Sequence, residues 1–170
     1  MVKNVLMSLT KETKKRIYQI LSEIKDPEIP VINIVELGII KEVELNNGIL
    51  EVSITPTYSG CPAMHAIKSE IVSRLKSENY YSVVVKIAYS PAWTTDFMTQ
   101  EAKEKLKNYG IAPPKELNRE TCIPISLEAV ECPFCGSSHT ELKSRFGSTA
   151  CKSFYYCKNC LQLFEHFKSF

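Results

Sequence analysis

Two pairs of cysteines near the C-terminus have the spacing of metal ligands: Cys132-Pro-Phe-Cys135 and Cys157-Lys-Asn-Cys160. The 21 residues between the pairs, 136 to 156, are enough for a strand, a turn and a returning strand. Four thiolates brought together in this way form a closed tetrahedral site, the usual arrangement of structural zinc. The pattern predicts a zinc ribbon over residues 131–170. It indicates how this tail folds but not what the protein does.

Other ligands and another metal stay open at this point. His139 and His166 are alternative ligands, although thiolates suit a knuckle better. Cys151 could also compete for the metal, or pack inside the ribbon. A rubredoxin-like site would hold iron instead, and Cys135-Gly136 suits that idea whereas Cys160-Leu161 does not.

Cys61 is the second candidate for chemistry, because Gly60-Cys61-Pro62 stands where a helix is predicted to begin. The helix dipole and unpaired N–H groups there favour a thiolate, the form that binds a soft metal or attacks an electrophile. The alternative is a small buried apolar residue, the commonest fate of a free cysteine. His65, one turn further along, could assist a metal at Cys61.

Asp26 and Glu28 flank a proline in a predicted loop and form a pair of nearby carboxylates. Such a pair could coordinate iron or act as acid and base, although it more often caps and solvates a turn. The sequence has no Ser/His/Asp set, phosphate-binding loop or dinucleotide fingerprint. With three histidines in all, the sequence does not favour a histidine-dependent hydrolase.

Composition limits the remaining possibilities. The 170 residues are 44% hydrophobic and 24% charged, with a net charge of +2. These values are typical of globular domains, and the charge does not call for nucleic acid. No apolar run is long enough for a membrane span, and the N-terminus does not look like a secretory signal. Seven cysteines without such a signal favour a reducing cytoplasm; no role is assigned to Cys122.

Hydrophobic periodicity predicts a small α/β layer, with helices packed on a short mixed sheet. Thr10 caps the first helix, Asp26-Pro27 ends it, and Asn46-Asn47-Gly48 closes a hairpin between the first two strands. The predicted order is helix, strand, strand, helix, strand, helix, at residues 10–25, 39–45, 49–55, 62–77, 83–87 and 95–109.

We therefore predict an α/β fold in three parts. Residues 1–112 form a layered αββαβα domain, residues 113–130 a linker, and residues 131–170 the zinc ribbon.

Several segments together resemble the PaaD (also called PaaJ) family of bacterial phenylacetate degradation. The resemblance covers about residues 12 to 170. The segments are Asp26-Pro-Glu-Ile-Pro30, Glu36-Leu-Gly-Ile-Ile40, Thr55-Pro-Thr-Tyr-Ser-Gly-Cys-Pro-Ala-Met64, Ser90-Pro-Ala-Trp-Thr-Thr-Asp96 and, in the ribbon, Cys132-Pro-Phe-Cys-Gly-Ser137, Phe146-Gly-Ser-Thr149, Cys151-Lys152 and Cys157-Lys-Asn-Cys160. The part before the ribbon also resembles the SufT-like proteins of iron–sulfur cluster assembly.

The resemblance implies an accessory protein for the multicomponent phenylacetyl-CoA epoxidase, whose oxygenase and reductase contain diiron and iron–sulfur centres. It implies that the chain assists the maturation of these centres without catalysing the ring chemistry. Cys61 is then the candidate carrier of transient iron or of a cluster, with Asp26, Glu28 and Thr57 as supporting residues. The expected partners are the epoxidase subunits or the iron–sulfur assembly machinery. A homodimer would place two copies of Cys61 around one cluster.

Three other functions compete with this interpretation. The chain could be a stoichiometric subunit or adaptor of the oxygenase, which would copurify at fixed ratio. It could be a rubredoxin-like redox protein, which would be red rather than colourless. It could be a nucleic-acid-binding ribbon, which the near-neutral charge disfavours.

Overall fold

The computed structural model describes residues 9–114 and 130–169, and Cys122 lies outside them. The chain divides by its contacts into two compact units, residues 1–93 and 94–170. The sequence predicts this boundary at residue 112. In the structure the last helix before the ribbon belongs to the C-terminal unit, not to the unit of the first sheet. No helix in the described ranges has both the length and the apolar content to cross a membrane.

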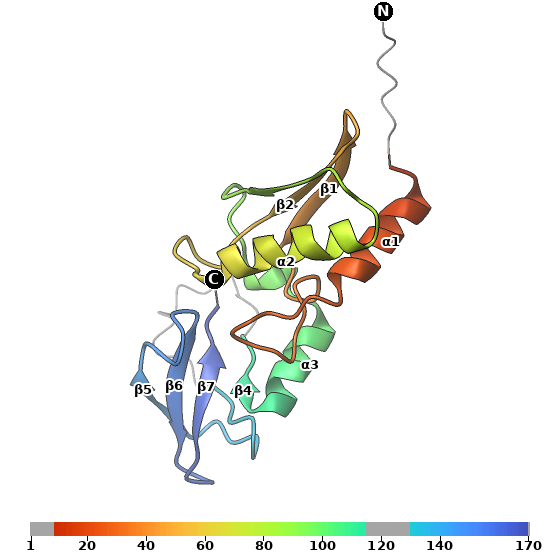
Figure 1. Ribbon diagram of the computed structural model, residues 1–170. Helices are drawn as coiled ribbons and strands as arrows, with labels where there is room; N and C mark the ends of the chain where they lie inside the picture. The colour runs from red at the N-terminus through yellow and green to blue at the C-terminus, as the bar shows by residue number, and fades with distance from the viewer. Residues whose placement is uncertain (1–8, 115–129, 170) are drawn as a thin grey trace, which may run out of the picture. The chain divides into compact units, whose positions relative to one another are not determined.

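The N-terminal unit is built on a three-stranded mixed sheet (Figure 1). Strand β2 (Ile49–Ile54) pairs antiparallel with β1 (Ile40–Asn46) and parallel with β3 (Val83–Ile87). The β1–β2 turn has positive φ angles at Asn47 and Gly48, 52° and 80°. Asn and Gly tolerate these angles, which match the twist of the two strands. The predicted mixed sheet and its hairpin are confirmed.

A helix packs on the apolar face of this sheet, against β3. On β2, Leu50, Val52 and Ile54 are at most 2% exposed, and they alternate with the half-buried Glu51 and Ser53. Helix α2 (Ala63–Ser77) buries Ala63, Ile67, Ile71 and Leu75, the residues that its period predicts, and also Met64. Each fully buried large aliphatic side chain contributes about 1.5–3 kcal/mol, so this stripe fixes how α2 lies on the sheet.

Helix α1 (Lys11–Leu21) begins as predicted, because Thr10 Oγ1 accepts a hydrogen bond from Thr13 N at 3.2 Å. It ends at Leu21, so the predicted end at residue 25 is wrong. The Ser22 hydroxyl donates to the Gln19 carbonyl at 2.6 Å, and the next two N–H groups bond three residues back, which tightens the chain out of the α-helix.

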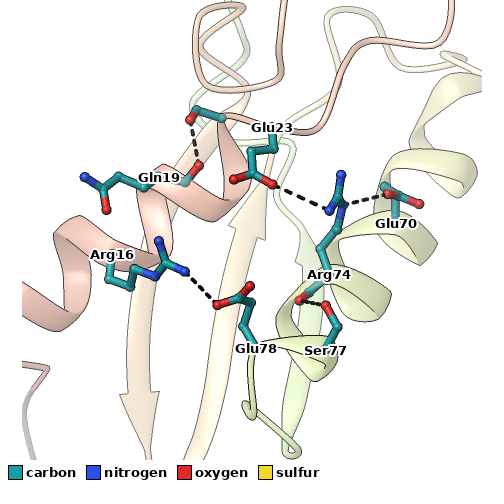
Figure 2. A network of polar contacts seen from close by, with 8 residues as sticks. Arg16, Gln19, Glu23, Glu70, Arg74, Ser77 and Glu78 are labelled. Carbon is teal, nitrogen blue, oxygen red and sulfur yellow. Dashed lines mark hydrogen bonds and ion pairs between the residues drawn. The ribbon is translucent and has the colours of Figure 1, made fainter.

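Ion pairs link α1 and α2 on the surface of this unit (Figure 2). Arg16 contacts Glu78 at 2.8 Å, and Arg74 contacts Glu23 at 3.5 Å. Arg74 also contacts Glu70, one turn away within α2, at 3.3 Å. All five side chains are more than 40% exposed, so each pair is worth at most about 1 kcal/mol. The pairs orient the helices, but apolar burial holds them.

The C-terminal unit begins with a short 3₁₀ helix, η1 (Thr95–Phe97), followed by α3 (Gln100–Tyr109). The prediction of one helix over 95–109 is therefore wrong at its start. Met98 is extended, and Thr99 Oγ1 caps α3 by accepting from Ala102 N at 3.1 Å. The end of α3 is as predicted, because Gly110 adopts a left-handed φ of 91°.

A four-stranded sheet in the order β4-β7-β6-β5 forms the rest of this unit. Strands β5 (Thr140–Ser144), β6 (Lys152–Cys157) and β7 (Leu163–Phe167) are antiparallel neighbours, and β4 (Ile111–Ala112) joins β7 in parallel. The ribbon predicted as two strands thus gains β7 and β4. One face carries a small core of Ala112, Val130, Cys132, Tyr155, Cys157 and Phe164.

Candidate functional site

The four predicted ligand cysteines converge at the end of the C-terminal sheet. The Sγ atoms of Cys132, Cys135, Cys157 and Cys160 all lie within 4.8 Å of one another. Two of the cross-pair distances, Cys132–Cys160 and Cys135–Cys157, are 3.6 Å. A tetrahedral zinc with bonds of about 2.3 Å places its sulfurs about 3.8 Å apart. The sulfur cage therefore fits zinc, and the predicted zinc ribbon is confirmed.

Each cysteine pair lies in the same kind of backbone turn. Gly136 N donates to the Cys132 carbonyl at 2.8 Å, and Leu161 N donates to the Cys157 carbonyl at 2.9 Å. Both residues have positive φ, 72° for Gly136 and 62° for Leu161. The second turn thus makes an apolar branched residue adopt the left-handed conformation that glycine supplies in the first.

Backbone and amide N–H groups donate hydrogen bonds to sulfurs of this cage. Cys160 N donates to Cys157 Sγ at 3.5 Å, and Asn159 Nδ2 donates to Cys135 Sγ at 3.7 Å. The N–H of Ser137 lowers the pKa of Cys135 to about 6, whereas burial raises the pKa of Cys132 and raises that of Cys160 to about 12. Such donors fix the orientation of the ligands and stabilise the negative charge that four thiolates bring to zinc.

The alternative ligands lie apart from the sulfur cage. His139 is exposed, and His166 is buried with its Nδ1 3.4 Å from the Ser153 hydroxyl. Cys151 is 4% exposed, and its Sγ lies 3.0 Å from Thr149 Oγ1. In residues 9–114 and 130–169, the four paired cysteines form the only group of three or more ligand side chains close enough to share a metal.

Cys61 lies in the N-terminal unit, in the loop between β2 and α2. Helix α2 begins two residues later, with Pro62 in the cap position and no side-chain cap. Cys61 is half-buried, and its N–H donates to the Tyr58 carbonyl at 3.1 Å. The predicted place at a helix N-terminus is therefore correct.

The predicted ionisation of Cys61 is wrong. Burial raises the pKa of the thiol above its ordinary value, and the nearby charges of Glu28 and Asp26 raise it further. The N–H of Ala63 and the hydroxyl of Thr57 act in the opposite direction without reversing the shift. The two carboxylates and the buried surroundings outweigh the helix terminus, so Cys61 is a thiol at neutral pH.

The same interactions show that the structure brings Asp26, Glu28 and Thr57 close to Cys61, from two loops far apart in the sequence. Asp26 is 7% exposed, and its Oδ1 accepts from Glu28 N and Ile29 N at 2.8 Å each. This carboxylate therefore shapes the loop as well as facing the thiol. His65 is exposed.

Sequence reasoning missed the residues that hold the Asp26 loop. Asn33 Oδ1 accepts from Glu36 N at 2.8 Å, and Glu36 Oε2 accepts from Asn33 N at 3.1 Å. Trp93 Nε1 donates to the Leu37 carbonyl at 3.1 Å and is 4% exposed. The spacing Asn33-x-x-Glu36 is that of a capping box and could have revealed the first contact.

Comparisons with known proteins agree with this division into a thiol-bearing α/β domain and a zinc ribbon. Residues 14–89 match the family model of an iron–sulfur cluster assembly protein, and residues 125–168 match the PaaD zinc beta ribbon domain. The chain is thus an iron–sulfur-assembly-type domain joined to a zinc ribbon.

One relative identifies the family to which the chain belongs. A protein of Escherichia coli (strain K12), provisionally named as one of the subunits of 1,2-phenylacetyl-CoA epoxidase, is 43% identical over 152 residues, which are 89% of this chain and 90% of the relative. The chain belongs to the PaaD family, to which its zinc ribbon also matches.

More distant relatives match the N-terminal domain. An Fe-S protein maturation auxiliary factor of Porphyromonas gingivalis is 32% identical over 97 residues, 56% of this chain and 91% of that protein. The crystal structure of a domain of unknown function, DUF59, from Bacillus anthracis is similar with 27% identity and a TM-score of 0.50, over 54% of this chain and 89% of that one.

Proposed function

We propose that this chain is an accessory protein, not an enzyme, that assists the assembly of the iron–sulfur or diiron centres of a multicomponent phenylacetyl-CoA epoxidase. The proposal draws on the similarity of the chain to the E. coli epoxidase protein and of its N-terminal domain to Fe-S maturation factors. The observation that carries it is the half-buried Cys61 thiol, with Thr57, Asp26 and Glu28 close to it.

The surroundings of Cys61 suit transient rather than permanent binding of a metal or cluster. Cys61 contributes one sulfur, and the described residues near it do not form a group of three metal ligands. A metal or cluster held by one protein thiol must complete its coordination elsewhere, from a second copy or from a partner. Incomplete coordination lets the cargo leave, which a carrier requires and a resident cofactor site does not. The zinc ribbon, in contrast, is closed by four ligands.

The test is a Cys61→Ser variant expressed in place of the natural chain with the epoxidase subunits. We expect the epoxidase to accumulate with little iron and little activity, while the variant keeps its fold and zinc. His65→Ala is the matched control, because this exposed residue lies four positions along the same segment. Full iron content and activity of the epoxidase with the Ser variant would refute the carrier role.

A second function is favoured by the raised pKa of Cys61, because a protonated thiol is a poorer metal ligand. In this alternative the chain is a stoichiometric adaptor of the oxygenase, and Cys61 only packs in its loop. Copurification with the oxygenase at fixed ratio, unchanged in Cys61→Ser, would support the adaptor. Substoichiometric, transient association would support the maturation factor.

A further inference from the structure

A cavity of about 430 Å³ lies in the C-terminal unit. It is on the face of the sheet that also carries the small core around Tyr155 and Phe164. Leu142, Tyr155 and His166 line its floor from β5, β6 and β7. Arg145 and Lys168 also line it, from the segments that follow β5 and β7. The volume is within the range of small-molecule sites, about 300–1,000 Å³, and is far larger than the roughly 30 Å³ of one water.

The charges of this cavity are all of one sign. Its described lining contains Arg145 and Lys168 but no carboxylate. Lys168 Nζ donates to the Ala150 carbonyl at 2.6 Å and lies 4.8 Å from the centre of the Phe146 ring, which also lines the cavity. Neither cation has a carboxylate partner among the residues that the structure describes.

The other three cations of the ribbon differ from these two. Lys143 and Lys158 both contact Glu141, at 3.0 and 3.2 Å, and Lys152 contacts Glu165 at 2.9 Å. Within the described part of the ribbon, the two cations left without an acidic partner are thus the two that face the cavity. Burial also lowers the pKa of Lys168, as expected of an ammonium group that is short of solvation.

Apolar surface makes up most of the remaining wall. Leu142, Phe146 and Tyr155 supply two aromatic rings and an aliphatic side chain. A bare inorganic anion would satisfy the cations but leave this surface uncovered, and a neutral apolar molecule would leave the cations uncompensated. A ligand with both parts meets both requirements.

We propose that this cavity binds a small organic anion with a flat aromatic body. Its carboxylate or phosphate lies between Arg145 and Lys168, and its ring packs against Phe146 and Tyr155. The proposal concerns the ribbon alone and does not depend on the role of Cys61. It gives the ribbon a binding function beside its structural zinc.

The test uses the zinc-loaded full chain and the fluorescent aromatic anion 8-anilinonaphthalene-1-sulfonate, with the neutral N-phenyl-1-naphthylamine as the matched probe. We expect saturable binding of the anion at one site and much weaker binding of the neutral probe. Arg145→Gln and Lys168→Gln should each weaken binding of the anion by about fivefold to tenfold, as expected for loss of one charge-assisted contact. Unchanged zinc content and circular dichroism would show that the variants fold.

Lys143→Gln is the control, because Lys143 is the neighbouring cation that already contacts Glu141. Its affinity for the anion should stay within about twofold of the natural chain. Displacement of the probe by benzoate or by phenyl phosphate would support the proposal and identify the preferred anionic group. Equal binding of both probes, equal weakening by Lys143→Gln, or no displacement by either competitor would overturn it.

Discussion

The two cysteine turns provide a matched experiment on the zinc ribbon. Gly136 and Leu161 occupy the same position after the second cysteine of each turn, with φ angles of 72° and 62°. A side chain in this conformation destabilises the fold by about 1–2 kcal/mol. Glycine avoids this strain but costs about 0.5–1 kcal/mol, because its unfolded chain has more conformational entropy to lose. Leu161→Gly should therefore stabilise the zinc-bound ribbon by about 1 kcal/mol, and Gly136→Ala should destabilise it by about the same amount.

Packing does not complicate either change. Leu161 is 66% exposed, so its removal forfeits little buried surface. A Cβ added at Gly136 meets no atom within 4 Å, so its cost is conformational only. The magnitude corresponds to about a fivefold change in equilibrium, by the relation that 1.4 kcal/mol is tenfold.

The assay is competition for zinc with a chromophoric chelator at equilibrium, supported by thermal unfolding of the zinc-bound chain. We expect Leu161→Gly to retain zinc about fivefold better and Gly136→Ala about fivefold worse. Opposite signs for the two variants are the essential result. Weaker zinc retention by Leu161→Gly, or a neutral Gly136→Ala, would show that backbone strain does not control this centre.

Two further predictions follow from specific contacts. Gly147→Ala should destabilise the ribbon by about 1–3 kcal/mol in a denaturant titration, because the added Cβ would lie 3.0 Å from Lys152 Cβ and 3.1 Å from the Lys152 backbone carbon, as well as 2.8 Å from Glu165 Oε1; a loss below about 0.5 kcal/mol would contradict it. Cys61 should react with iodoacetamide more slowly at pH 8 than a free cysteine, and Asp26→Asn should speed the reaction by lowering the pKa of the thiol; no acceleration would contradict the electrostatic cause. The raised pKa also makes the stability of the fold depend on pH. The contribution of the Cys61 thiol to the free energy of unfolding is fully present below its unfolded pKa, about 8.5, and is lost as pH rises through the higher folded pKa.

Local signals in the sequence were sufficient for most of the elements. Thr10 and Gly110 mark a helix start and a helix end through their own hydrogen-bonding and φ preferences, and both were predicted. The Asn-Gly turn likewise fixes the β1–β2 hairpin. Errors arose where another residue competed nearby, as Ser22 did at the end of α1 and Thr99 at the start of α3.

Pairings between distant segments were not predictable in the same way. Strand β4 has only two residues, Ile111–Ala112, and is a strand because β7 lies beside it. Two residues are too few to show the alternation of buried and exposed side chains that predicts a strand. The same applies to the cavity of the C-terminal unit. Arg145 and Lys168 are 23 positions apart, and they line one cavity only because of the register of the ribbon strands.

The sequence by itself determined the zinc centre, since the two Cys-x-x-Cys turns are local and each needs only its own backbone to present two sulfurs. The tertiary structure decided the chemistry of Cys61. Position at a helix start predicts an ionised thiol, but Asp26 and Glu28 are brought beside it from another loop, and burial there raises the pKa. The reason is physical: a dipole at a helix end is a local property, whereas desolvation and the charges of distant residues exist only once the chain has folded.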